Sequence, residues 1–422
     1  MENLERQYIL LSKDTPLIEF NLLKTTEIVE YRQVNSYKLQ ITAIHKENKN
    51  LFPKRILLLK KINEEDLLNW IESRKIPKNR QFTENILNAI GDNENPLRYA
   101  DITQALSVND AYWIKRIDQK IMWKDCNLYE HPFDERLSMV AFTGHSRKIK
   151  GLITSPEITS NGALKKCWKR IGDSIYLMKG DDIFPKKDGR TQAILEYYAC
   201  QIAQNMGIDY VPYELGEFKH SNNEKEIVCL SKLFTNENVG YVTADIFFAS
   251  KGVDVEKIDY TSSKNQLKLA NLFGKNKYAD MMIFDGIICN QDRHFGNFGY
   301  LINNNTADFI KPAPIFDNGM SLLYRGAAVD LANPLPYIKG SGGEGVMGRF
   351  DDRIWDFIEK RHLPFLRKLT TFKFQNHPKY PISEKTIALL SKFINKRAQR
   401  AMILYREKEK AKKLFLNQNM ER

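Results

Sequence analysis

Residues 285–301 read DGIICNQDRHFGNFGYL and join an apolar helical run to a polar loop. The apolar positions 281–288 are spaced as in a buried helix, and a short strand is expected at 298–302, directly after the loop. Further along, the segment 313–319 (APIFDNG) repeats the arrangement, because a short apolar strand at 314–316 again ends in an acid and a turn. Two acidic loops, each held by an apolar element, are therefore the first candidates for a functional site.

The polar residues of these loops have the spacing that phosphoryl transfer requires. That reaction needs a carboxylate that orients the acceptor hydroxyl, and an Asn and a second carboxylate that hold Mg²⁺ on the phosphates of ATP. Asp292, Asn297 five positions later, and Asp317 supply this set. The spacing from Asp292 to Asn297 equals that of the kinase catalytic loop, and the segment 316–319 is a looser form of Asp-Phe-Gly.

Each residue also has an ordinary structural interpretation. Asp, Asn and Gly are common in turns, so an Asp-x₄-Asn loop alone is weak evidence. The second acidic loop is what favours the catalytic interpretation of Asp292 and Asn297, with Asn297 and Asp317 as magnesium ligands. His294 lies in the same loop, and we expect it to support the loop rather than to act as a base.

Three upstream features complement this set. Lys179 ends a predicted strand, where a lysine can grip nucleotide phosphates, and Glu196 lies on the next helix, where it can orient Lys179. The turn that contains Gly162 and Ala163 can present backbone N–H groups to phosphates, although a single glycine makes this signal weak. A surface Lys and a surface Glu would be the alternative; the order of these residues ahead of the acidic loops argues against it.

The periodicity predicts an α+β protein in three parts: an accessory α/β module at 1–149, a small β-rich lobe at 150–235 and a larger α-helical lobe at 236–422. In the module we expect strands at 8–11, 17–22, 37–44 and 56–59, then helical structure from 63 to 121. In the small lobe we expect a hairpin at 166–178, a helix at 191–206 that ends at Gly207, and strands at 214–218 and 227–234.

The composition indicates a soluble globular protein, with 42% hydrophobic and 27% charged residues. No apolar run is long enough to cross a bilayer and no secretory signal is evident, so we expect a cytoplasmic location and no membrane contact. Five scattered cysteines without a CxxC pair favour reduced thiols and no structural metal site.

The net charge of +12 favours polyanionic partners, such as nucleotide, nucleic acid or an acidic protein surface. The basic residues are densest at 396–413. No aromatic side chains are interleaved there for base stacking, so a solvated helix is the favoured interpretation. Nucleic acid is expected only through a complex or through this helix.

These residues, in this order, resemble the HipA-like serine/threonine kinases, bacterial relatives of the protein-kinase fold. The match spans about residues 150–420 and rests on these segments: 159–166, 176–180, Glu196, 206–212, 290–297 and 314–319. The resemblance implies a two-lobed, protein-kinase-like fold and an ATP- and Mg²⁺-dependent serine/threonine protein kinase. It does not identify the protein substrate, and an antitoxin-like regulatory protein would be a partner of the kind this family has.

The resemblance also implies roles for individual residues. Lys179 would be the ATP lysine, Asp292 the catalytic aspartate, and Asn297 and Asp317 the magnesium ligands. The adenine hinge would be formed by the backbone of Lys232, Leu233 and Phe234. In that family the phosphate loop can carry an autophosphorylated serine, and alignment on Gly162 puts Thr159 there, with Ser160 beside it.

Two alternatives remain. The triplet at 292–294 followed by Asn297 also looks like the catalytic loop of phosphoinositide kinases, which phosphorylate lipid headgroups. A kinase-like module that binds nucleic acid or protein without catalysis is the other. The presence of all four key residues (Lys179, Asp292, Asn297 and Asp317) argues against this second alternative.

Overall fold

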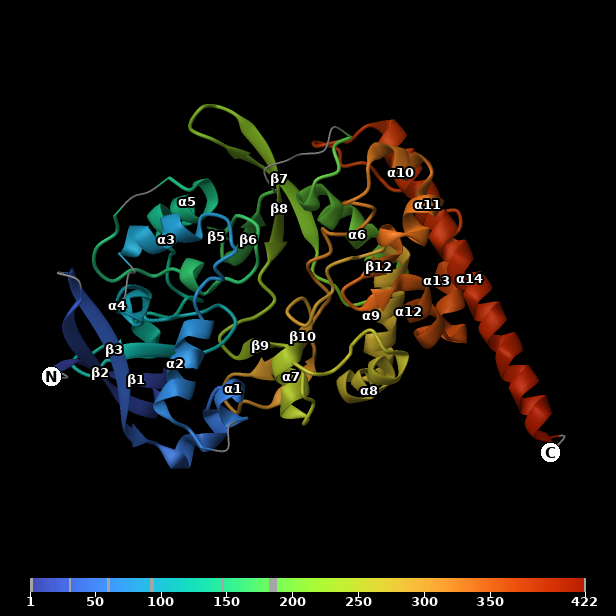
Figure 1. Ribbon diagram of the computed structural model, residues 1–422. Helices are drawn as coiled ribbons and strands as arrows, with labels where there is room; N and C mark the ends of the chain where they lie inside the picture. The colour runs from blue at the N-terminus through green and yellow to red at the C-terminus, as the bar shows by residue number, and fades with distance from the viewer. Residues whose placement is uncertain are drawn as a thin grey trace. The chain divides into compact units, whose positions relative to one another are not determined.

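The computed structural model describes residues 3–29, 32–58, 61–91, 95–145, 148–181 and 188–420 (Figure 1). The chain divides into two compact units. The first comprises 1–180, 232–242 and 300–311, and the second comprises 181–231, 243–299 and 312–422. Both contain helices and strands, which confirms the mixed α and β composition; the three-part division at 150 and 236 stays a prediction. Among the described residues, no helix is long and apolar enough to cross a membrane.

The first unit begins with a four-stranded antiparallel sheet in the order β3-β2-β1-β4. Its strands are β1 (Asn3–Ser12), β2 (Thr15–Val29), β3 (Arg32–Ile44) and β4 (Tyr112–Arg116). Leu10 pairs with Ile18 on one side and with Ile114 on the other, and all three side chains are fully buried. The three strands predicted at 8–11, 17–22 and 37–44 are thus present, within longer elements.

Two predictions in this part are wrong. The run at 56–59 is not a strand: α1 (Lys54–Leu57) is a single helical turn after Pro53, and residue 59 lies outside the described residues. Four apolar residues cannot distinguish a helix from a strand by their spacing. The helical pattern does not continue to 121 either, because Tyr112–Arg116 is β4. Its aromatic and β-branched residues suit a strand, and β1 supplies the hydrogen-bonding partner.

The remaining elements of the first unit are shorter. Its other helices are α2 (Glu64–Ser73), α3 (Thr83–Ile90), α4 (Arg98–Thr103) and α5 (Glu135–Thr143), with 3-10 turns at Lys46–Leu51, Trp123–Asp125 and Glu157–Thr159. The predicted hairpin is β5 (Lys166–Ile171) with β6 (Ser174–Lys179). A three-stranded sheet, β11-β10-β9, is formed by β9 (Val239–Thr243), β10 (Gly299–Asn303) and β11 (Phe309–Pro312). The sequence predicted only β10 of these three.

The second unit is mainly helical. Its elements are α6 (Gln192–Met206), β7 (Tyr213–Lys219), β8 (Lys225–Lys232), α7 (Ala244–Ser250), α8 (Ser263–Phe273), α9 (Lys275–Ile288), α10 (Ala328–Ala332), α11 (Pro334–Lys339), β12 (Glu344–Gly345), β13 (Gly348–Arg349), α12 (Phe350–Phe357), α13 (Leu363–Leu369) and α14 (Glu384–Met420), with 3-10 turns at Ser341–Gly343 and Lys360–His362. The bounds of α6 follow from its caps: Thr191 accepts a bond from the Ile194 N–H, and Gly207 takes the left-handed conformation at φ +66°. Helix α9 packs against α12 and α14.

The basic C-terminal helix α14 changes character along its length. Its first part contributes buried side chains, among them Leu390, Phe393 and Leu404. From residue 410 to 418 every side chain is exposed. This part of the helix is solvated, as its charge pattern predicted.

Candidate active site

The loop after α9 is held in shape by polar side chains of its own. Helix α9 ends at Cys289, which has a left-handed backbone at φ +52°. Asn290 donates from its amide to the Asp285 carboxylate at 3.1 Å, and its amide oxygen accepts the Asp292 N–H at 3.1 Å. The Asn297 amide then donates to the Asp292 carbonyl at 2.8 Å and lies 3.4 Å from its carboxylate. Asp292 and Asn297 are therefore brought together, as their spacing predicted.

Arg293 connects this loop to the second acidic loop. Its side chain is only 1% exposed and pairs with Asp285 at 2.9 Å. The same guanidinium donates to the carbonyls of Asn297 and Phe316 at 2.7 and 2.6 Å, and to the Asn318 side chain at 2.6 Å. One buried cation thus joins α9, the 290–297 loop and the 316–318 segment.

The segment around Asp317 is fixed from two further directions. The Asp317 N–H donates to the Tyr213 hydroxyl at 3.2 Å, and the backbone at Asp317 has φ +58°. The Asn318 N–H donates to the Glu196 carboxylate at 2.8 Å. Gly319 is required here, because a Cβ atom would lie 2.9 Å from the Gln192 carbonyl at the start of α6.

The surroundings of Asp292 shift the pKa of its carboxyl group. Burial raises the pKa of Asp292 above its ordinary value, and the neighbouring Asp317 raises it further. His294 opposes this shift of the Asp292 pKa, and so do the guanidinium groups of Arg325 and Arg293. His294 itself accepts the Gly296 N–H at 3.0 Å on its Nδ1 atom, which fits the loop-supporting role predicted for it.

The residues predicted for the nucleotide lie in both units. Lys179 ends β6 in the first unit and is 6% exposed, whereas Glu196 lies on α6 in the second unit and is 1% exposed. Their pairing therefore stays a prediction. Of the predicted hinge, Lys232 ends β8, the Leu233 N–H donates to the Ile175 carbonyl at 2.8 Å, and the Phe234 ring contacts Tyr241 edge to face.

The predicted phosphate loop lies in the first unit. Gly162 has φ +99°, and a Cβ atom there would meet the Lys166 ammonium. No hydrogen bond is present from the backbone N–H groups of residues 161–164 to any described part of the chain. Thr159 and Ser160 are each 6% exposed, and their hydroxyls donate to the carbonyls of Leu106 and Pro156 at 2.7 Å. Both predicted phosphorylation sites are thus buried in this conformation.

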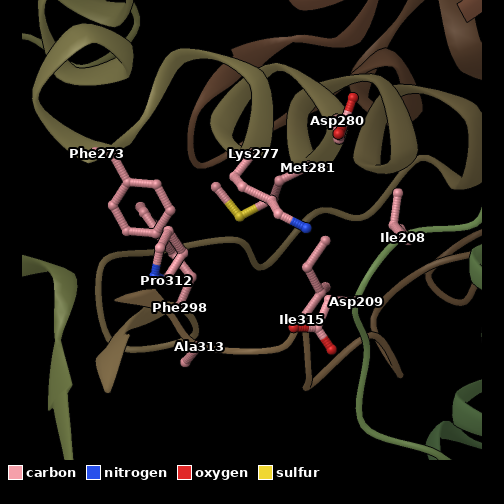
Figure 2. Close-up of a pocket in the computed structure, with 10 residues that line it drawn as sticks. All are labelled: Ile208, Asp209, Phe273, Lys277, Asp280, Met281, Phe298, Pro312, Ala313 and Ile315. Atoms are coloured by element: carbon pink, nitrogen blue, oxygen red, sulfur yellow. The ribbon is translucent and has the colours of Figure 1, made fainter. Parts of the chain in front are cut away.

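A small pocket lies beside the strand segment that leads to Asp317 (Figure 2). It is lined by Ile208, Asp209, Phe273, Lys277, Asp280, Met281, Phe298, Pro312, Ala313 and Ile315. Ile315 forms a parallel bridge with Tyr210, so the strand predicted at 314–316 is reduced to one bridge. None of Asp292, Asn297 and Asp317 lines the pocket, which separates it from the candidate reaction centre.

Four residues of the site were not predicted from the sequence: Asp285, Arg293, Asn318 and Tyr213. For Asp285 a signal exists, since an acid on an otherwise apolar helix face needs a buried cation, and Arg293 follows eight positions later. Nothing local indicates Tyr213 or Asn318, because their roles depend on contacts between remote segments.

No protein-family model matches the chain. It is 31% identical over 137 residues to the serine/threonine-protein kinase CtkA of Helicobacter pylori, which corresponds to 30% of this chain and 39% of that relative. Over that stretch the chain is related in sequence to this serine/threonine-protein kinase. It matches well under half of the length of its curated relative.

Two solved structures are also similar to this chain. The crystal structure of the proinflammatory kinase CtkA from H. pylori is 20% identical, with a TM-score of 0.43, and covers 59% of this chain and 93% of that one. The HipA, HipB and operator DNA complex of Shewanella oneidensis is 9% identical, with a TM-score of 0.49, and covers 93% of this chain and 96% of that one.

The candidate site offers few side chains that could act as metal ligands. Among the described residues, no group of three or more His, Cys, Asp or Glu side chains could hold a metal ion. Mg²⁺ in kinases is bound by one or two carboxylates together with substrate phosphates and water, so a larger cluster is not required. Because Asn297 uses its amide nitrogen on Asp292, its amide oxygen is the atom that can face a cation.

Proposed function

We propose that this chain is an ATP- and Mg²⁺-dependent serine/threonine protein kinase. The observation that carries the proposal is the Arg293 link, because it holds Asp292 and Asn297 of one loop against the Asp317 segment of the other. A catalytic carboxylate and two oxygen ligands from adjoining loops are the protein groups that phosphoryl transfer needs. The sequence relationship to a serine/threonine-protein kinase supports the same conclusion.

Each residue then has a defined role. Asp292 orients the acceptor hydroxyl and receives its proton, while Asn297 and Asp317 present oxygen atoms to the metal. Mg²⁺, when bound, neutralises charge on the phosphates of ATP. Lys179 holds the phosphates, and Glu196, which also accepts the Asn318 N–H, positions the Asp317 segment. The backbone of 232–234 meets adenine, and Gly162 and Ala163 face the phosphates.

Two further proposals concern regulation. Phosphorylation of Thr159 or Ser160 would require the loop to leave its present position, because both hydroxyls are buried and hydrogen-bonded. An antitoxin-like protein would be the regulatory partner, and nucleic acid would be reached through that complex or through the basic end of α14.

The test is transfer of labelled phosphate from ATP by purified protein, with Mg²⁺ or with EDTA. Generic protein substrates and phosphoinositide vesicles would be offered in parallel, and phosphorylation of the chain itself would be mapped by mass spectrometry. We expect Mg²⁺-dependent labelling of protein serine or threonine. Labelling of lipid alone would instead support the phosphoinositide-kinase alternative, and absence of nucleotide binding would support a non-catalytic module.

The raised pKa of Asp292 predicts the pH dependence of this activity. The carboxylate is the active form, so activity should be lost as pH falls through its pKa, at a higher pH than for an ordinary Asp. His294 lowers the pKa of Asp292, so His294→Gln should move the acidic limb of kcat/KM to still higher pH. The measurement is a pH profile of kcat/KM for both proteins. An acidic limb that stays in place or moves to lower pH in the variant contradicts the assignment.

A further inference from the structure

Arg80, in the segment between α2 and α3, is a buried cation that the proposed reaction does not use. Its side chain is fully buried and lies 3.6 Å from the equally buried Glu157 carboxylate. Its backbone is held firmly, because the Arg80 N–H donates to the Pro77 carbonyl and the Arg80 carbonyl accepts the Thr83 hydroxyl at 2.8 Å. Because its own backbone is held in place, the Arg80 guanidinium can restrict the position of a neighbouring segment.

The segment that Arg80 holds is the predicted phosphate loop. The guanidinium donates to the carbonyls of Glu157 and Ser160, both at 3.0 Å, and to that of Lys166 at 2.9 Å. These carbonyls flank the loop on both sides. Three charge-assisted bonds from one rigid fork restrict the loop more than single bonds would.

The neighbour of Arg80 adds two bonds at the centre of the loop. The Gln81 N–H donates to the Ala163 carbonyl, and the Gln81 amide oxygen accepts the Lys165 N–H, both at 2.8 Å. The Ala163 carbonyl is thus engaged by Gln81, whereas within the described residues the backbone N–H groups of 161–164 donate to no other group and can face an anion. Consecutive N–H groups of this kind form an anion-binding concavity.

The same contacts fix the loop relative to Lys179. In the β5–β6 hairpin, Lys166 is the residue paired with Lys179, and the Gly180 N–H donates to the Lys165 carbonyl at 3.0 Å. The Lys166 carbonyl that Arg80 grips is therefore opposite the candidate ATP lysine in the strand register. Movement at Lys166 would be passed directly to Lys179.

We propose that Arg80 is a positioning residue by which the accessory module holds the 157–166 loop in its nucleotide-binding conformation. The inference rests on the proposed kinase function and assigns the N-terminal module a role in it. Arg80 touches neither the nucleotide nor the reacting atoms; it acts through the loop backbone. In this proposal the accessory module contributes to phosphate binding by holding the loop that contacts the phosphates.

The test compares Arg80→Met with a matched control, Arg74→Met. Arg74 is an arginine of the same module whose side chain is 8% exposed; it binds the Ala105 carbonyl at 2.8 Å and Asp110 at 2.8 Å, and it makes no hydrogen bond to the loop in the described structure. Both variants should lose stability. Only Arg80→Met should raise the KM for ATP, by about tenfold, with kcat at saturating ATP changed less than about twofold. Equal KM values in the two variants would overturn the proposal.

A second measurement does not depend on activity. Trypsin should cut after Lys165 or Lys166 at least several times faster in Arg80→Met than in Arg74→Met, at a temperature where both are folded. The milder Gln81→Ala, which removes the bond to Lys165, should show the same trend if Arg80→Met does not fold. An unchanged rate of cleavage in the folded variants would refute the proposal that Arg80 and Gln81 hold the loop in place. If the unaltered protein binds no ATP, the kinase proposal fails, and with it the positioning role, whatever the trypsin result.

Discussion

Asp292→Asn is expected to reduce phosphoryl transfer by about a thousandfold or more, while the protein stays folded. The change keeps the size of the side chain and removes the carboxylate that orients the acceptor hydroxyl and takes its proton. The Asp292 carbonyl, which accepts the Asn297 amide at 2.8 Å, is untouched, so the loop should keep its shape. Single-turnover transfer of labelled phosphate, with thermal unfolding in parallel, measures both properties.

The control for this variant is Asp352→Asn. Asp352 is exposed on α12, so its change should leave both rate and stability within the error of measurement. Because burial raises the pKa of Asp292, neutralising it should stabilise the fold slightly or leave it unchanged. A folded Asp292→Asn protein with full activity would remove Asp292 from the catalytic role.

The local parts of this site could be predicted from the sequence, because they depend on short spacings. Asp292 and Asn297 lie in one loop, and the segment at 316–319 is recognisable in the sequence because an apolar run ends there in an acid. Helix α6 was predicted with its correct end because Gly207 stops it locally. Residue spacing and turn-forming residues belong to a single segment, so they can be recognised without knowing what that segment contacts.

The remote parts could not be predicted in the same way. Strand β4 has its partner β1 about a hundred residues upstream, and without that partner its short apolar run is indistinguishable from the end of a helical pattern. Likewise, Arg293 binds Asn318 across 25 positions, and Tyr213 meets Asp317 across 104. Tertiary pairing decides such cases, and one sequence holds no record of it.

The largest loss of stability is expected for Arg293→Met. The change leaves the Asp285 carboxylate buried without its cation, and also removes the donors to Asn297, Phe316 and Asn318. Breaking a buried ion pair from one side costs about 3–5 kcal/mol of unfolding free energy. Arg361→Met is the control, since Arg361 forms a partly exposed pair with Asp280 that is worth at most about 1 kcal/mol. Urea denaturation of both variants measures the difference in unfolding free energy. Equal losses in the two variants would contradict the role of Arg293 in joining α9 to the two acidic loops.

A double change separates the two functions of Arg293. In Asp285→Leu with Arg293→Met, no buried charge is left unpaired, so part of the lost stability should return, because apolar side chains can replace a buried ion pair at little cost. Activity should not return, since the link from Arg293 to the Phe316 carbonyl and to Asn318 is still missing. Recovery of stability together with phosphoryl transfer would show that Arg293 serves only to neutralise Asp285. Recovery of stability alone would show that the guanidinium holds the two acidic loops in register for catalysis.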